Sequence, residues 1–149
     1  MSNPRNPEDE PFLLDTNVVA EWVQPTPDPG VIAWTHSVDE DRVSLSVITL
    51  AELRGGVERL PQSRRRTRLE EWLEVELPRR FGERVLAVDE AVAHAWGRIV
   101  AEAYGSGHPI SIMDGFLAAT AKVHHLTLAT RNVADFEHTN VPTFNPWTA

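Results

Sequence analysis

Phe12-Leu13-Leu14-Asp15-Thr16-Asn17 is the stretch of sequence that decides the fold. An uncharged apolar run that changes abruptly to a carboxylate, a hydroxyl and an amide is typical of a buried strand with polar groups at its carboxyl end. In open parallel sheets, ligands and catalytic groups gather at that end of the strands. The segment therefore predicts a central strand over residues 12–14, and it places Asp15 at the edge of the sheet where chemistry is expected.

Strands and helices are predicted to alternate along the rest of the chain. Short apolar runs predict further strands at residues 43–45, 85–88, 126–130 and 141–144. Helical spacing of apolar side chains predicts helices over residues 16–23, 29–38, 50–60, 62–80, 89–105 and 112–123. Pro78 is expected to bend or end the fourth of these helices. This order predicts one α/β domain, in which a small parallel sheet is sandwiched between helices as three α/β/α layers.

Length and composition limit the class of protein. The chain has 149 residues, enough for a single domain at residues 12–149, and the proline-rich polar segment 1–11 is expected to be a flexible tail. The absence of cysteine excludes disulfides, thiolate metal ligands and cysteine nucleophiles. No apolar run is long enough for a membrane span and the N-terminus does not resemble a signal peptide, so a cytoplasmic location is expected. The net charge of -8 argues against a broad nucleic-acid-binding surface.

Four carboxylates are candidates for a shared site. Asp15, Glu52 and Asp114 each lie just past a predicted strand or at the start of a predicted helix, and Asp135 follows the strand that ends near residue 130. If the sheet is parallel, these groups lie at the same edge, where the carboxyl ends of the strands meet. Carboxylates that lie close together repel one another unless they are protonated or bridged by a cation. Oxygen ligands without cysteine or suitably spaced histidine indicate Mg²⁺ or Mn²⁺. Such a site is typical of enzymes that hydrolyse phosphodiesters.

Each carboxylate also has a purely structural interpretation. Thr49 with Glu52, and Ser111 with Asp114, match the capping box that begins many helices. Asp15 is itself a good helix cap. Taken one at a time, these acids are therefore more often helix-start residues than ligands, and only their convergence favours a metal site.

Four blocks of sequence occur in a fixed order between residues 13 and 136. They are Leu13-Leu14-Asp15-Thr16-Asn17, Ala51-Glu52-Leu53-Arg54-Gly55-Gly56, Asp114-Gly115-Phe116-Leu117-Ala118-Ala119-Thr120-Ala121 and Thr130-Arg131-Asn132-Val133-Ala134-Asp135-Phe136. In this order they resemble the motifs of PIN-domain ribonucleases. More narrowly, they resemble the VapC toxins of bacterial toxin–antitoxin pairs, in the FitB-like branch.

The resemblance implies a PIN-like α/β/α domain and Mg²⁺- or Mn²⁺-dependent hydrolysis of RNA. By position, the family's metal-binding acids correspond to Asp15, Glu52 and Asp114, and its polar support for the first of them corresponds to Thr16 and Asn17. Thr130 and Arg131, beside the same edge of the sheet, are further supporting candidates. The fourth acid is left open by the sequence. Asn132 stands where many members have an acid and Asp135 follows three residues later, and either one would help to hold a second metal ion.

The resemblance also implies partners. VapC-like proteins are typically blocked by a VapB-like antitoxin whose segment lies in a groove of the toxin, and they commonly form homodimers. Two alternatives stay open from the sequence: a housekeeping RNA-processing nuclease without an antitoxin, and a non-catalytic PIN-like binding module in which the acids only cap helices. Arg131 would contact a phosphate or be a solvated loop residue, and the arginine cluster at 64–68 would bind RNA or pair with glutamates on its own helix.

Overall fold

The computed structural model describes residues 10–148, so residues 1–9 of the expected tail lie outside the described part of the chain. The strands are β1 (Phe12–Leu14), β2 (Val43–Ser46), β3 (Val85–Leu86), β4 (Thr127–Ala129) and β5 (Thr143–Phe144). The α-helices are α1 (Thr16–Glu21), α2 (Pro29–Ser37), α3 (Val47–Glu58), α4 (Arg64–Glu71), α5 (Leu77–Phe81), α6 (Glu90–Gly105) and α7 (Ile112–Val123). Short 3₁₀ or π turns are η2 (Glu40–Arg42), η3 (Trp72–Glu76), η4 (Gly82–Arg84), η5 (Val133–Phe136) and η6 (Pro146–Thr148).

The strands form one parallel sheet of five in the order β3-β2-β1-β4-β5, with β1 at its centre. The predicted α/β/α fold class is therefore confirmed. Leu14 pairs with Ala129 of β4, and Asp15 N–H donates a 2.9 Å hydrogen bond to the carbonyl of Ala129. The residues that follow the two strands, Asp15 and Thr130, are thus neighbours at the carboxyl edge of the sheet.

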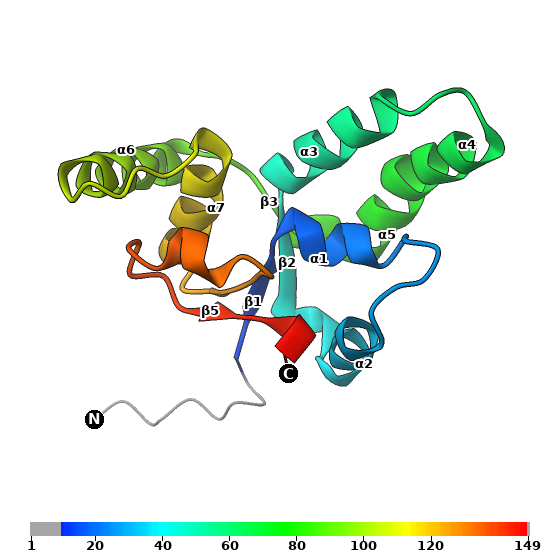
Figure 1. Ribbon diagram of the computed structural model, residues 1–149, viewed down its shortest axis with the longest axis horizontal. Helices are drawn as coiled ribbons and strands as arrows, with labels where there is room; N and C mark the ends of the chain where they lie inside the picture. The colour runs from blue at the N-terminus through cyan, green and yellow to red at the C-terminus, as the bar shows by residue number, and fades with distance from the viewer. Residues whose placement is uncertain (1–9, 149) are drawn as a thin grey trace.

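Alternate side chains of β1 enter two different hydrophobic cores. Phe12 and Leu14 pack in the core that α1, α2, α3 and α5 complete, whereas Leu13 packs with α6 and α7. Figure 1 shows these two groups of helices on opposite sides of the sheet. A strand that is covered on both faces needs apolar side chains at every position, because successive residues point to opposite faces. This explains the uninterrupted apolar run before Asp15.

Helix α3 begins earlier than the sequence predicts. The hydroxyl of Ser46, the last residue of β2, accepts a 3.0 Å hydrogen bond from the backbone N–H of Ile48 and caps the helix. Thr49 is fully buried within the first turn. The prediction that Thr49 and Glu52 form a capping box is therefore wrong, and Glu52 lies in the second turn of α3 with no capping role.

The predicted helix at 62–80 is present at residues 64–81 and widens in its middle. Helices α4 and α5 are joined by the π-helical turn η3 with helical backbone at both junctions, and Pro78, predicted to bend or end the helix, lies in the first turn of α5 and does not end it. Proline has no N–H to donate and its ring clashes with the carbonyl four residues earlier, so a wider turn before it relieves the conflict. Arg66 of α4 pairs with Glu70 of the same helix at 2.8 Å, as one of the two interpretations of the arginine cluster predicts, and also with Glu58 of α3 at 3.0 Å.

Within residues 10–148, every helix is too short or too polar to cross a membrane.

Candidate active site

Asp15 lies at the floor of the acidic edge. Its side chain is 6% exposed, and one carboxyl oxygen accepts a 2.7 Å hydrogen bond from Thr16 N–H while the other accepts a 2.8 Å hydrogen bond from the Thr130 hydroxyl. The pKa of Asp15 is raised to about 6, first by burial and then by the charges of Asp114 and Glu52, against the lowering effect of these hydrogen bonds. Asp15 is thus both the cap of α1 and a carboxylate that feels its acidic neighbours.

Thr16 connects the first helix to Glu52. Its hydroxyl lies 2.8 Å from Glu52 Oε1, to which it donates, and 3.3 Å from the hydroxyl of Thr49. Because Thr16 follows β1 directly and α3 follows β2 directly, the parallel pairing of β1 with β2 brings these two helix starts together. The sequence predicts only a capping role for Thr49, and the structure adds its buried hydroxyl to the site.

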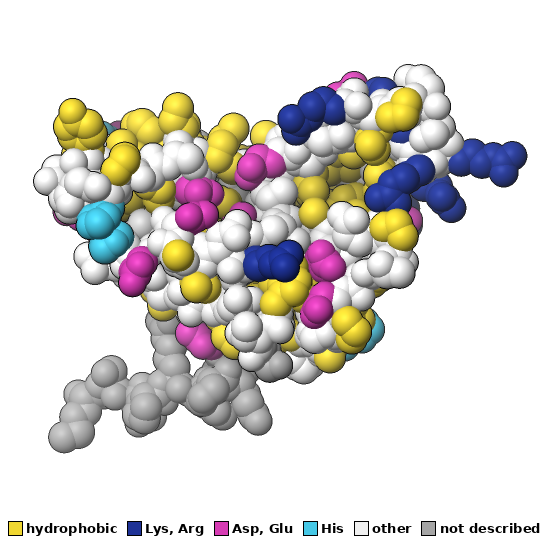
Figure 2. Space-filling view, in the orientation of Figure 1, with side chains coloured by type: hydrophobic (Ala, Val, Ile, Leu, Met, Phe, Trp, Pro, Cys, Tyr) yellow, Lys and Arg dark blue, Asp and Glu magenta, His cyan; other side chains and the backbone are white. Residues whose placement is uncertain are grey.

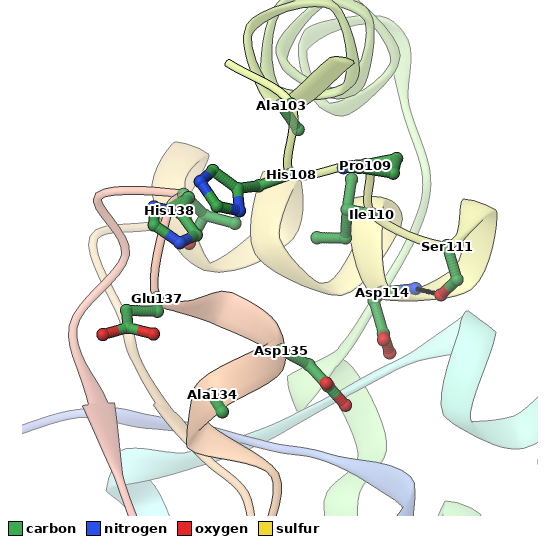
Figure 3. Close-up of a pocket in the computed structure, with 12 residues that line it drawn as sticks. Ala103, His108, Pro109, Ile110, Ser111, Asp114, Ala134, Asp135, Glu137 and His138 are labelled. Carbon is green, nitrogen blue, oxygen red and sulfur yellow. Dashed lines mark hydrogen bonds between the residues drawn. The ribbon is translucent and has the colours of Figure 1, made fainter.

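Asp114 enters the site from the first turn of α7. Its backbone N–H donates a 3.2 Å hydrogen bond to the hydroxyl of Ser111, which caps that helix as predicted. The pKa of the half-buried Asp114 is raised by burial first and then by the charges of Asp135 and Glu52. Figure 3 shows the carboxylates of Asp114 and Asp135 pointing into the same cavity.

The loop after β4 supplies the fourth acid. Thr130 N–H donates to the carbonyl of Phe144, and the Thr130 hydroxyl accepts a 3.0 Å hydrogen bond from Asn132 N–H. Asp135 follows on η5 and is exposed at the rim, where its charge acts on Asp114. Asn132 is exposed but is not among the residues that line this cavity, whereas Asp135 is.

Asn17 and Arg131 lie beside this loop. The Asn17 side-chain amide lies 3.4 Å from the Thr130 hydroxyl and 3.5 Å from Asp15 Oδ2, and its carbonyl accepts a 3.4 Å hydrogen bond from Arg131 N–H. The guanidinium of Arg131 lies over the ring of Trp147, 5.2 Å from its centroid. This cation–π contact holds an exposed positive charge close to the acidic edge.

The acids form a gradient of burial from the floor of the site to its rim. Asp15 is buried, Glu52 and Asp114 are half-buried, and Asp135 is exposed. Figure 2 shows acidic side chains gathered between α3 and α7, while Lys and Arg side chains gather over α4. The pKa values of Asp15 and Asp114 are raised first by burial and then by the charges of neighbouring acids, so the ionised form of both side chains is disfavoured despite their hydrogen bonds.

The chemistry of the donor set fits a hard divalent cation, because every candidate donor is an oxygen. The carboxylates are not close enough together for direct coordination, because across residues 10–148 no group of three or more His, Cys, Asp or Glu side chains could hold a metal ion. Mutual repulsion keeps uncompensated carboxylates apart.

Comparisons with known proteins agree with this architecture. The family model "PIN domain" matches residues 12–141. Toxin FitB of Neisseria gonorrhoeae is 44% identical over 136 residues, which are 91% of this chain and 98% of FitB. VapC ribonuclease Y4jK of Sinorhizobium fredii is 38% identical over 136 residues, which are 91% of this chain and 97% of that relative.

Solved structures give the same result. The crystal structure of FitAcB from Neisseria gonorrhoeae matches with a TM-score of 0.88 and 43% identity, covering 93% of this chain and 99% of that one. The structure of FitAB bound to an IR36 DNA fragment matches with a TM-score of 0.87 and 41% identity, covering 91% and 95%. The chain therefore belongs to the PIN-domain family, together with the FitB and VapC proteins that it resembles over nearly its whole length.

Proposed function

We propose that this protein is a metal-dependent endoribonuclease that hydrolyses RNA phosphodiester bonds and acts as the toxin of a VapBC-type toxin–antitoxin pair. The observation that carries the proposal is the buried carboxylate of Asp15, whose pKa is raised to about 6 beside Asp114 and Glu52. Burying a carboxylate next to other acids costs folding free energy, so a purely structural cap would not need this arrangement. Membership of the PIN-domain family and a VapC ribonuclease among the relatives support the same activity.

Asp15, Glu52 and Asp114 would hold Mg²⁺ or Mn²⁺, with Asp135 as the fourth acid. A divalent ion at such a site supplies Lewis-acid polarisation of the phosphodiester and lowers the pKa of the attacking water. Thr130 and Thr16 orient Asp15 and Glu52 through hydrogen bonds of 2.8 Å each. We favour Asp135 over Asn132 because only Asp135 lines the cavity and acts on the pKa of Asp114.

Arg131 would bind a phosphate of the RNA. It is exposed, it lies one residue beyond Thr130, and its backbone is tied to Asn17. A phosphate approaching an acidic edge in a chain of net charge -8 is repelled, and a positive side chain beside the site offsets that repulsion. Trp147 restricts the guanidinium to the same side of the loop, which lowers the entropy lost when the phosphate binds.

The partner we propose is a VapB-like antitoxin, and we propose further that the toxin acts in the cytoplasm as a homodimer. Structures of FitAcB and of FitAB bound to DNA are among the solved structures that this chain matches over at least 91% of its length. An antitoxin segment that carries basic side chains would complement the unneutralised acids of the site. Expression of the chain alone is expected to arrest bacterial growth, and co-expression of its antitoxin to restore growth.

The test is to titrate Mn²⁺ into the purified wild type and into Asp114→Asn, following heat of binding and degradation of RNA in the same samples. The wild type is expected to bind the ion and degrade RNA, and the variant to lose both while keeping its thermal transition. Growth arrest by the wild type, and its loss in Asp114→Asn, separates a toxin from a housekeeping nuclease. A folded variant that binds Mn²⁺ and cleaves as the wild type does would remove Asp114 from the site.

A further inference from the structure

A cavity of about 680 Å³ extends from the acidic cluster towards two histidines (Figure 3). Its walls come from the end of α6, the loop before α7, the first turn of α7 and the chain from η5 to Thr139. Asp114 and Asp135 point into one end, whereas His108 and His138 lie together at the other. The volume falls within the range of pockets that bind small organic groups.

The two imidazoles form a face-to-face pair. Their ring centroids are 3.8 Å apart and their planes are inclined by 9°. Both residues are exposed, so a stacked planar surface is presented to solvent beside the cavity. No step of the proposed hydrolysis uses either ring.

The backbone holds His108 firmly in this position. Helix α6 ends in a Schellman motif: Gly107 adopts φ +78°, its N–H donates 3.2 Å to the carbonyl of Tyr104, and His108 N–H donates 2.9 Å to the carbonyl of Ala103. The left-handed conformation suits glycine and turns the chain towards the cavity. His108 is therefore placed by the helix terminus itself.

His138 is held by a second hydrogen-bonded turn. Thr139 N–H donates 3.1 Å, and the Thr139 hydroxyl 2.7 Å, to the carbonyl of Phe136. Phe136 and Thr139 are both buried, so the exposed ring between them projects from an anchored segment. Two exposed aromatic rings on fixed turns lose little conformational entropy when a third ring stacks on them.

The charges around the cavity indicate what it binds. The charged side chains among its described lining residues are the carboxylates Asp114, Asp135 and Glu137, and none of these lining residues is Arg or Lys. No lysine or arginine of the wall is therefore available to hold a phosphate by itself. A neutral planar group fits better, and single-stranded RNA is recognised by stacking its unpaired bases on aromatic side chains, including histidine.

We propose that His108 and His138 form a stacking platform for one base of single-stranded RNA, next to the scissile phosphate at the carboxylates. The inference rests on the proposed ribonuclease function and adds two substrate-positioning residues to it. Stacking on the platform requires an unpaired base.

The first experiment does not depend on cleavage. Adenosine is titrated into the metal-free protein while the imidazole proton signals are followed by NMR, with ribose as the ligand that lacks a base. The signals of His108 and His138, assigned with the two alanine variants, are expected to shift with adenosine and not with ribose, whereas that of His36 on α2 stays unchanged. Failure of adenosine to shift either signal, or an equal effect of ribose, overturns the platform.

The second experiment measures cleavage of a short single-stranded RNA with Mn²⁺. His108→Ala and His138→Ala are each expected to raise KM about tenfold, within the range that loss of one base–aromatic stack gives, while kcat stays within about twofold. His108→Phe restores KM because it keeps an aromatic face, and His36→Ala is the matched control. Unchanged KM in both alanine variants, or no rescue by phenylalanine, contradicts stacking. A wild type that cleaves no RNA refutes the proposed function, and the adenosine titration then still decides the platform.

Discussion

The hydroxyl of Thr16, at the start of α1, donates a 2.8 Å hydrogen bond to Oε1 of Glu52, which lies 36 residues later in the second turn of α3. Thr16 follows the central strand and Glu52 lies in α3, so the parallel register of β1 with β2 is what brings them together. This hydrogen bond restricts the rotation of the half-buried Glu52 carboxylate at the acidic edge. Glu52 is therefore a positioned group, and its position depends on Thr16.

Thr16→Val tests that dependence, because valine keeps the shape and removes the donor. Loss of an outer hydrogen bond to a metal-binding carboxylate commonly weakens metal affinity by 10- to 100-fold, so the Kd for Mn²⁺ is expected to rise about tenfold. The free energy of unfolding should fall by about 1.5–3 kcal/mol, as for a hydrogen bond to a charged group. Calorimetric titration and urea denaturation measure the two effects.

Thr67→Val is the matched control for this substitution. The Thr67 hydroxyl bonds only within the exposed helix α4, at 3.1 Å from the carbonyl of Ser63. Its Mn²⁺ affinity should equal that of the wild type. Equal losses in the two variants would mean that Thr16 does not position Glu52.

The raised pKa of Asp15 predicts a pH-dependent stability in the metal-free protein. The folded state keeps a proton on Asp15 up to a pH of about 6, whereas the ordinary pKa is 3.8. Because the folded state binds more protons in that window, the free energy of unfolding falls as pH rises from about 4 to about 6, by up to roughly 3 kcal/mol. Urea denaturation in EDTA at several pH values across this range measures the slope.

Asp15→Asn should remove much of that slope, since asparagine does not titrate. The amide still accepts from Thr16 N–H with its oxygen, although it loses the hydrogen bond that Thr130 donates to the second carboxyl oxygen. Asp89→Asn, which changes a helix-cap carboxylate of α6, is the reference for an ordinary cap. Parallel pH curves for the wild type and Asp15→Asn would show that the buried carboxylate does not control this dependence.

The identity of the fourth acid gives a third prediction. Asp135 and Asp114 line the same cavity and the charge of Asp135 raises the pKa of Asp114, whereas Asn132 lies outside the lining. Asp135→Asn is therefore expected to lower the pKa of Asp114 and to weaken Mn²⁺ binding about tenfold. Asn132→Ala should leave the affinity within about twofold. NMR titration of the Asp114 carboxyl carbon measures its pKa, and calorimetry measures the Mn²⁺ affinity of both variants. A larger loss of affinity in Asn132→Ala than in Asp135→Asn would make Asn132 the ligand.

The sequence predicts the sheet and most of the site because both follow from local patterns. The apolar run at 12–14 identifies the central strand, and the alternation of strands with helices implies that Asp15, Thr130 and the start of α3 share one edge. The exact start of α3 does not follow, because Ser46 and Thr49 are both competent caps. The pairing of Ser46 with Leu86 of β3 extends β2 to Ser46, so the helix begins at Val47.

Local sequence patterns do not predict which residues on separate loops lie close together in the folded chain. The sequence makes Asn132 and Asp135 equivalent candidates for the fourth metal-binding residue. The structure distinguishes them, because only Asp135, on η5, lines the cavity. His108 and His138 are 30 positions apart on two separate turns, and nothing periodic connects them. Gly107, two residues after the end of α6, is a local signal, since its left-handed backbone fixes where His108 emerges.

The last prediction concerns Gly115, which follows Asp114 on α7. A Cβ at this position would lie 2.8 Å from Trp96 Nε1 and 3.2 Å from Val100 Cγ2, both on α6. Trp96 cannot yield without cost, because its Nε1 donates a 3.1 Å hydrogen bond to the carbonyl of Ile112 and its ring stacks on Phe116 at 5.1 Å. Gly115 is therefore the residue that lets α6 and α7 pack closely.

Gly115→Ala is expected to lower the free energy of unfolding by about 1–2 kcal/mol, because the overpacking of about 1–3 kcal/mol exceeds the gain of up to about 1 kcal/mol in helix propensity. Gly97→Ala on α6 is the matched control, since its Cβ meets nothing within 4 Å, and it should be neutral or up to about 1 kcal/mol more stable than the wild type. Urea denaturation of the wild type and the two variants measures the change in the free energy of unfolding for each substitution. Stabilisation by Gly115→Ala equal to that by Gly97→Ala would show that the two helices have room to separate, and that the position of Asp114 does not depend on their close packing.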